Sequence, residues 1–197
     1  MQISRKTLFL GWLVGLLLLV GCAQSPQYLQ VKPSVGQSLP QVGNGQSVTL
    51  DVVDGRESDV LGTRSGAAMS TAVISVEAHD LMPKLKSQAE QALVQMGFNP
   101  TTEPAPGRPS LTLTLTDLSY QKAEGKPMLD KAVLLARFRA VAGNDRQTYT
   151  GTYTAKREQE YAMKPGREAN TNMVSELLSR ALQRTFNDPQ IGSQLAR

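Results

Sequence analysis

Histidine and cysteine are almost absent from this chain, which has one of each among 197 residues. His79 alone leaves no choice of residues for a histidine-dependent triad, and Cys22 has no second cysteine with which to form a disulfide. A zinc site needs several such side chains, and the acidic residues of the segment 51–59 lack the spacing of an EF-hand loop. Glycine-rich phosphate loops and the Gly-x-Ser-x-Gly motif are also missing. We therefore expect no enzymatic activity, no catalytic residues, no bound metal and no cofactor.

A strong excess of one charge is missing as well. The chain has 21 basic and 17 acidic residues, a formal net charge of +4. Two of the basic residues, Arg5 and Lys6, belong to an N-terminal segment that we expect to be removed, which leaves a net charge of +2. Without an arginine-rich stripe, such a charge gives no reason to expect a nucleic-acid partner.

A short apolar run over residues 8–20 follows the two basic residues and ends in Leu19-Val20-Gly21-Cys22. Its roughly 13 residues would form about 20 Å of helix, too little to cross a bilayer, so the run is typical of a signal peptide. The tetrapeptide resembles the lipobox of bacterial lipoproteins, in which cleavage precedes the cysteine and its thiol receives a diacylglyceryl group. This resemblance implies cleavage between Gly21 and Cys22, lipidation of Cys22 with diacylglycerol and palmitate, and a Gram-negative envelope. The alternative is an ordinary secretory signal with a cysteine after it by chance.

The residues after Cys22 bear on the membrane to which the lipid attaches. Ala23 stands where Asp resembles the inner-membrane retention signal of enteric bacteria, so we expect the outer membrane, with the protein facing the periplasm. Gln24 and Ser25 leave the inner membrane open, because some genera read those positions too. Two or three acyl chains on one cysteine give lasting attachment, whereas one chain gives marginal binding.

Three prolines separated by Gln, Ser and Gly follow the cysteine, a composition that disfavours both a packed core and a long helix. We predict that residues 1–21 are the signal peptide, that residues 22–45 are the lipidated N-terminus with a flexible linker, and that residues 46–197 form a single domain. As a coil, such a linker has an end-to-end distance of about 25 Å. The alternative for Tyr28, Leu29 and Val31 is docking as a short edge segment.

The rest of the chain alternates between strand and helix patterns. Apolar residues at every second position predict strands, and apolar stripes at spacings of three and four predict amphipathic helices. The first helix is expected to begin at Asp80 as its N-cap and to end at Gly97. The predicted strands are 47–53, 71–76, 111–116, 130–141 and 147–158, the first two forming an antiparallel pair, and the predicted helices are 80–96 and 170–187.

The last two predicted strands form a hairpin whose register follows from its loop. A two-residue loop, Gly143-Asn144 or Asn144-Asp145, places the apolar residues of both strands on one side of the sheet. The opposite side then exposes Arg137 and Arg139 beside a row of threonines that includes Thr150 and Thr152. We call this surface the Thr/Arg face. It is a candidate site for a carboxylate or phosphate of a glycan, lipid or peptide; the alternative is a merely solvated sheet face.

A second candidate pair, Asp54 and Arg56, stands at the end of the first strand. Residues two apart in an extended chain point the same way, so the pair is expected to form a charge-assisted bond that fixes the next loop. The alternative is a role in partner binding.

These elements predict an α+β fold, a two-layer sandwich with one mostly antiparallel sheet of about five strands and two helices packed on one face. The chain resembles the YajG family of Gram-negative lipoproteins in the lipobox at Cys22, in Asp54-Gly55-Arg56, in the helix ending at Gly97-Phe98, in the meander of three strands and in the helix near the C-terminus. The resemblance implies outer-membrane attachment and no agreed activity.

Two functions agree with these features. The first is a lipid-anchored, non-catalytic structural, assembly or protein-interaction module that binds another envelope protein. The second is a periplasmic module that binds a small ligand or lipid in a pocket between helices and sheet. The oligomeric state is left open by the sequence.

Overall fold

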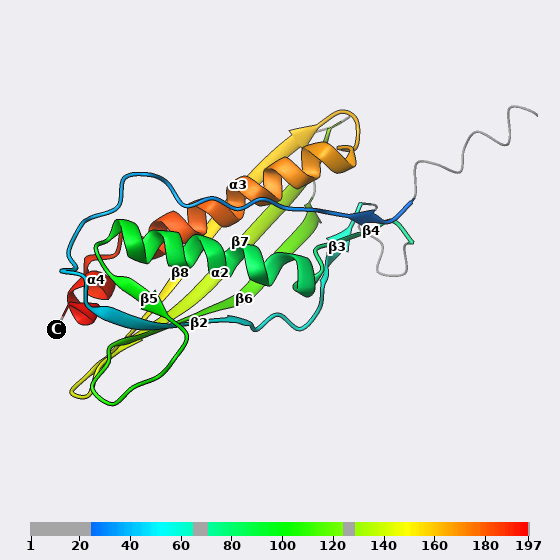
Figure 1. The fold of residues 1–197 in the computed structure, drawn as a ribbon. Helices are drawn as coiled ribbons and strands as arrows, with labels where there is room; N and C mark the ends of the chain where they lie inside the picture. Colours follow the sequence, from blue (N-terminus) through cyan, green and yellow to red (C-terminus); the bar gives the residue numbers. More distant parts are fainter. Residues whose placement is uncertain (1–24, 65–70, 124–128, 197) are drawn as a thin grey trace, which may run out of the picture.

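The computed structural model describes residues 25–64, 71–123 and 129–196, which form an α+β domain (Figure 1). The described helices are α2 (Ala78–Gln95), α3 (Arg167–Phe186) and α4 (Pro189–Leu195). None of these helices is long and apolar enough to cross a membrane. The strands are β1 (Gln27–Tyr28), β2 (Ser47–Asp54), β3 (Val60–Thr63), β4 (Val73–Ser75), β5 (Asn99–Thr101), β6 (Ser110–Ala123), β7 (Asp130–Gly143) and β8 (Thr148–Tyr161).

These strands form two mixed sheets, so the prediction of one mostly antiparallel sheet is wrong. A five-stranded sheet has the order β5-β2-β6-β7-β8, and a three-stranded sheet has the order β1-β4-β3. β2 runs parallel to both β5 and β6, whereas β6, β7 and β8 form an antiparallel meander. The parallel pairs arise because the chain crosses over through α2 before it returns beside β2. β4, predicted to pair with β2, instead pairs antiparallel with β3 and parallel with β1.

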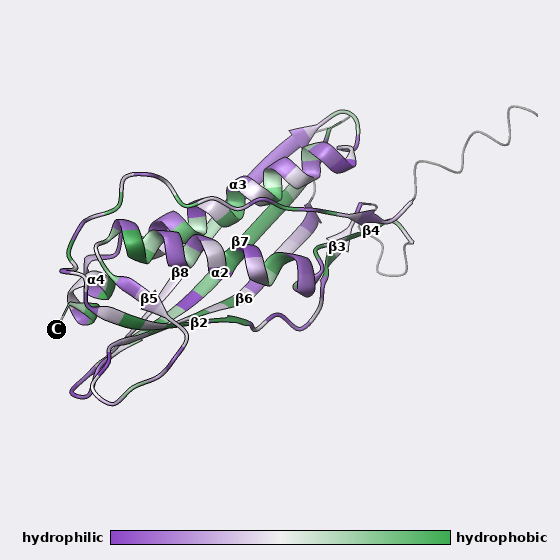
Figure 2. Ribbon diagram, viewed as in Figure 1, coloured by the Kyte–Doolittle hydropathy of each residue, from purple (hydrophilic) through white to green (hydrophobic). Residues whose placement is uncertain are grey.

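The main core lies between the five-stranded sheet and its helices. Figure 2 shows hydrophobic residues concentrated in β6 and β7, behind α2 and α3 in this view. Even-numbered residues of β7 from Ala132 to Ala142 are fully buried, with Phe138 among the largest, and Phe186 of α3 is buried as well. Burial of a Leu or Phe side chain stabilises a fold by about 1.5–3 kcal/mol, so this layer dominates the stability of the domain.

The C-terminus of α2 has the cap that the sequence predicts. Gly97 adopts φ +89°, its N–H donates to the carbonyl of Val94 (3.0 Å), and the N–H of Phe98 donates to the carbonyl of Leu93 (2.9 Å). These two bonds define a Schellman motif, in which glycine occupies the left-handed position without steric cost. The N–H of Gly43 also donates to the carbonyl of Met96 (2.8 Å), so a distant loop packs directly on the cap.

We expect Gly97→Ala to lower the free energy of unfolding by roughly 2–3 kcal/mol, as measured by urea denaturation. A Cβ at this position would combine a positive φ with a distance of 2.5 Å to the carbonyl oxygen of Gly43. Gly45→Ala is the matched control, because Gly45 has φ +80° but no atom within 4 Å of the added Cβ. Equal losses in both variants would contradict the role of the close approach.

Candidate functional site

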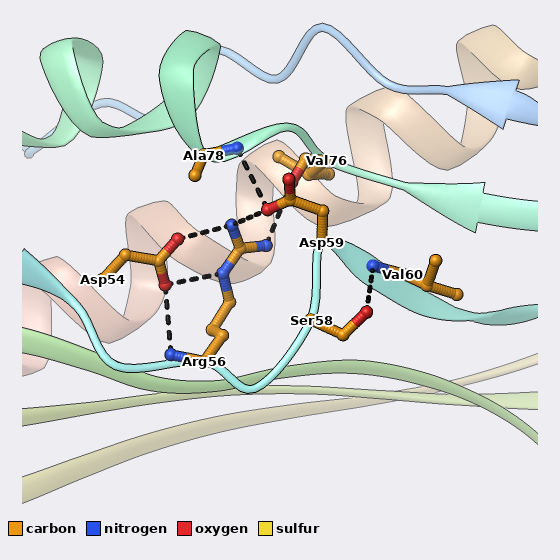
Figure 3. A network of polar contacts seen from close by, with 7 residues as sticks. All are labelled: Asp54, Arg56, Ser58, Asp59, Val60, Val76 and Ala78. Carbon is orange, nitrogen blue, oxygen red and sulfur yellow. Dashed lines mark hydrogen bonds and ion pairs between the residues drawn. The ribbon is translucent and has the colours of Figure 1, made fainter.

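Arg56 lies between two carboxylates just after β2, and its side chain is only 3% exposed (Figure 3). Its Nε and Nη2 donate to the two carboxylate oxygens of Asp54 (2.9 and 2.7 Å), and Nη2 also donates to Asp59 (2.9 Å). Nη1 donates to the carbonyl of Val76 (3.1 Å). The planar guanidinium is suited to this arrangement, because its donors match a carboxylate at two points and still reach further acceptors. The expected contact between Asp54 and Arg56 is therefore present.

Asp59, which sequence analysis did not single out, connects this cluster to the first helix. Its Oδ1 also accepts a hydrogen bond from the N–H of Ala78, the first residue of α2 (3.0 Å). A carboxylate at a helix N-terminus satisfies a free N–H and is favoured by the helix dipole. The cluster of Asp54, Arg56 and Asp59 thus holds together the end of β2, the start of β3 and the start of α2. The cluster therefore stabilises the fold, and we call these three residues the clasp.

The clasp also gives the fold a dependence on pH. The side-chain hydrogen bond from Arg56 holds the pKa of Asp54 below its usual value, against the opposing effect of burial. A carboxylate with a lowered folded-state pKa stabilises the fold above its unfolded-state pKa, and this contribution is lost as the pH falls through the folded-state pKa. The contribution of Asp54 is therefore complete at neutral pH and is lost in the acidic range below the normal aspartate pKa.

The Thr/Arg face lies on β6, β7 and β8. Pairing places Thr114, Arg139 and Thr152 side by side across the three strands. Arg139 and Thr152 are exposed, and within the described residues Arg139 has no polar partner. Arg137 is half-buried: its Nε donates to Thr154 (3.4 Å), and its Nη1 lies 3.8 Å from Asp117. Arg139 is thus the cation of this face that remains available to a ligand or partner.

The prediction that the apolar residues of both hairpin strands lie on the same side of the sheet is confirmed, but the turn lies one or two residues later than predicted. Phe138 pairs with Tyr153 and Ala140 with Gly151, which places the apolar residues of both strands on the same side. The turn begins at Asn144, whose N–H donates to the carbonyl of Gln147 (3.0 Å) and whose Oδ1 accepts the N–H of Gln147 (3.1 Å). The central residues are 145 and 146, because an Asn side chain stabilises a turn when it occupies the first position.

The structure does not combine the clasp and the Thr/Arg face into one site. In β2, Val48 and Leu50 are buried beneath the helices, and Asp54 shares their side by the two-residue period. Arg139 and Thr150 are exposed on the opposite side of the sheet. Of the six predicted site residues, Asp54 and Arg56 therefore stabilise the fold. The other four share a separate surface: Arg137, Arg139, Thr150 and Thr152.

A further feature is the extended segment Gln27–Gly36, which we call the arm. The sequence predicts it as part of a flexible linker, but in the structure it passes between α2 and α3 (Figure 1) and is hydrogen-bonded to both helices. Leu29, Val31 and Val35 are buried, Val31 completely. Gln27 is also buried and accepts a hydrogen bond from Asn170 of α3 (2.6 Å). The linker prediction is therefore wrong for the arm, because its alternating apolar side chains find a hydrophobic groove.

The polar contacts of the arm follow the spacing of α3. Four residues of helix rise about 6 Å and two residues of extended chain about 6.6 Å, so every second N–H of the arm meets every fourth helix residue. The N–H groups of Lys32, Ser34 and Gly36 donate to side-chain oxygens of Ser175 (2.9 Å), Ser179 (2.9 Å) and Gln183 (2.7 Å) of α3, respectively. On the other side of the arm, the N–H of Val35 donates to Gln88 of α2 (2.8 Å).

An open groove of about 940 Å³ runs between the outer edge of the arm and α3. Its wall carries basic side chains, among them Lys32 and Arg167, and acidic ones, Glu168 and Glu176. The groove lies on the outside of the helices and not between helices and sheet. Gly21 and Cys22, the predicted cleavage and lipidation positions, lie outside the described residues.

Comparison with known proteins gives a family and a shared fold. A family model described as an uncharacterized lipoprotein matches residues 33–195. A crystal structure of a protein from Xanthomonas campestris has a TM-score of 0.55 at 13% identity, covering 86% of this chain and 97% of that chain. A minor lipoprotein from Acinetobacter baumannii is 17% identical with a TM-score of 0.40, over 80% of this chain and 93% of that chain. No curated protein sequence matches the chain.

Proposed function

Because the chain belongs to this family of uncharacterized lipoproteins, we propose that it is a YajG-type outer-membrane lipoprotein, anchored through Cys22 and facing the periplasm, that acts as a non-catalytic protein-interaction module. The anchor and the family account for where the protein acts. Its surface accounts for how it acts, through contacts with another envelope protein and without chemistry of its own.

The observation that carries this proposal is the docked arm. Gln27 lies five positions after Cys22, and a fully extended chain of that length spans about 17 Å. A flexible linker through residue 45 would instead let the domain move away from the lipid by about 25 Å. An anchor on Cys22 therefore holds the domain close to the bilayer and restricts its orientation, as is useful for a protein that presents one surface to a membrane-associated partner.

The surface available for that partner is the Thr/Arg face. It lies on the side of the five-stranded sheet opposite the buried face of the meander, and it presents the guanidinium of Arg139, which has no polar partner among the described residues, beside threonine hydroxyls. An arginine surrounded by hydroxyl donors is suited to a carboxylate on a partner protein. The alternative function, ligand or lipid binding, receives less support, because the groove of about 940 Å³ is open and lined by charges of both signs.

Site-specific photo-crosslinking in cells tests the proposal. A photoreactive residue at position 139 is expected to give a discrete crosslinked envelope protein, identifiable by mass spectrometry. The matched control is position 94, because Val94 is 59% exposed but lies on α2, on the helical side of the domain. Equal crosslinking from both positions, or no product above background at position 139, would contradict the assignment of this face.

A further inference from the structure

The last strand of the five-stranded sheet, β8, has an unusual sequence at its edge. Its 14 residues pair with β7 on one side, and β8 is the final strand in the sheet order. Residues 148–154 read Thr-Tyr-Thr-Gly-Thr-Tyr-Thr, a segment without charge or proline. Natural sheets usually protect an exposed edge with charges, prolines or bulges, so a neutral segment of threonine and tyrosine at an edge is suited to pairing with another strand.

The backbone groups at this edge can be assigned from the turn. The bond from Asn144 N–H to the Gln147 carbonyl closes the hairpin, and hydrogen-bonded pairs alternate with non-hydrogen-bonded pairs along an antiparallel ladder. Odd-numbered residues of β8 therefore bond to β7, and even-numbered residues direct their N–H and C=O groups outward. The guanidinium of Arg184 donates to the carbonyl of Thr154, which agrees with an outward direction for that residue and means that the edge is already occupied at that position. The side chains of Thr150 and Thr152 are exposed, and this part of the edge is open.

The edge sequence is a palindrome centred on Gly151. When two identical strands pair antiparallel about that residue, Thr150 meets Thr152 of the other copy, Tyr149 meets Tyr153 and Thr148 meets Thr154. Threonine pairs are favourable neighbours across strands, and no like charges oppose each other within these seven residues. We propose that β8 pairs with β8 of a second copy of this chain, antiparallel about Gly151, to form a two-fold symmetric dimer.

The two tyrosines of the palindrome, on the helical side of β8, are held in place within one copy of the chain. The hydroxyls of Tyr149 and Tyr153 both donate to Oδ2 of Asp188, at 2.8 and 2.5 Å. A Cβ at Gly151 would overlap the ring of Tyr153, so glycine at the centre of the palindrome lets the ring lie flat along the strand. Residues directly opposite each other point to the same side of a sheet, so the dimer has one continuous ten-stranded sheet with the helices of both copies on one side. The Thr/Arg faces of the two copies become one surface.

Disulfide crosslinking in cells tests both the contact and its register. Full-length Thr150→Cys and Thr152→Cys copies with different tags are expressed together, and the mixed disulfide is expected as the main product because these positions lie directly opposite each other. Thr150→Cys alone should give little, because diagonal Cβ atoms are about 7–8 Å apart and a disulfide needs about 4 Å. The wild-type chain has no cysteine besides Cys22, so it provides the background.

Thr112→Cys is the matched control, because Thr112 shares the same face but lies two strands away from the edge. Absence of the mixed disulfide between positions 150 and 152, or equal yields with Thr112→Cys, would overturn the proposal. As a second measurement, light scattering of the purified full-length protein in detergent should give a dimer that Thr152→Pro converts to a monomer and Thr152→Ser retains. The N–H that proline removes at this position is directed outward and is not bonded to β7, and Thr152→Ser keeps it. A monomeric wild-type protein or a dimeric Thr152→Pro protein would contradict the proposal.

Discussion

Arg56→Ala is expected to lower the free energy of unfolding by about 3 kcal/mol, the largest effect that we predict for the loss of a polar side chain. Arg56 is buried, and it supplies the donors for both carboxylates of the clasp and for the carbonyl of Val76. Removal of the guanidinium leaves Asp54 and Asp59 without a counter-ion, and partial solvent exposure of Asp59 keeps the loss at the lower end for a buried ion pair. Urea denaturation at neutral pH measures the change.

Arg56→Lys is the control for this prediction. Lysine keeps the charge, but its ammonium cannot bind one carboxylate at two points while it reaches Asp59 and Val76. We therefore expect a loss between that of Arg56→Ala and the wild type. A change within about 0.5 kcal/mol for Arg56→Ala would be typical of an ordinary surface residue and would show that the clasp does not hold the β2–α2 junction together.

Val31→Asp is expected to displace the arm and to lower the free energy of unfolding by about 3 kcal/mol. Val31 is completely buried between the helices, so the variant either buries an unpaired carboxylate or loses the packing of the arm. Lys32→Asp is the matched control, because Lys32 is exposed and its backbone N–H still reaches Ser175. Urea denaturation of both variants gives the comparison, and equal losses would contradict a docked arm.

The regular elements of the domain were predictable because each carries a complete local signal. The amphipathic stripe of α2 and Gly97 at its end predicted the helix and its C-terminal cap within two residues. The alternation in β7 and β8 predicted which residues share a face. The turn lies one or two residues later than predicted, but even-numbered residues of β7 still pair with odd-numbered residues of β8. Local patterns of this kind depend on nearby residues alone.

The missed features depend on contacts between distant residues. β6 continues beyond its predicted end at residue 116. A bulge near Thr116 makes the next buried residue after Leu115 Leu118 and not residue 117, so the alternation that predicts a strand is interrupted there. Asp80 was expected to cap α2, but it instead bonds to Lys84, and the free N–H of Ala78 is satisfied by Asp59, 19 residues away. No local pattern indicates a cap that comes from a loop so distant in the sequence.

The arm is the error with the greatest consequence for function. The three prolines and the polar residues of segment 22–45 are typical of a linker, and that composition outweighed the alternation of Leu29, Val31, Pro33 and Val35 within the arm. The alternation was a usable signal, and it agreed with the alternative of a docked edge segment. Recognition of a groove between two helices required the tertiary structure, since the groove is made by residues more than 50 positions away.

Hydrogen exchange of the full-length lipidated protein in a bilayer tests the central claim that the arm and the domain form one unit at the membrane. We expect the backbone amides of Lys32, Ser34 and Gly36, which are bonded to α3, to exchange far more slowly than those of an unstructured chain. Exchange of these amides at the rate of a random coil, while the amides of α3 stay protected, would show that the arm is a free linker and that it does not hold the domain at the membrane.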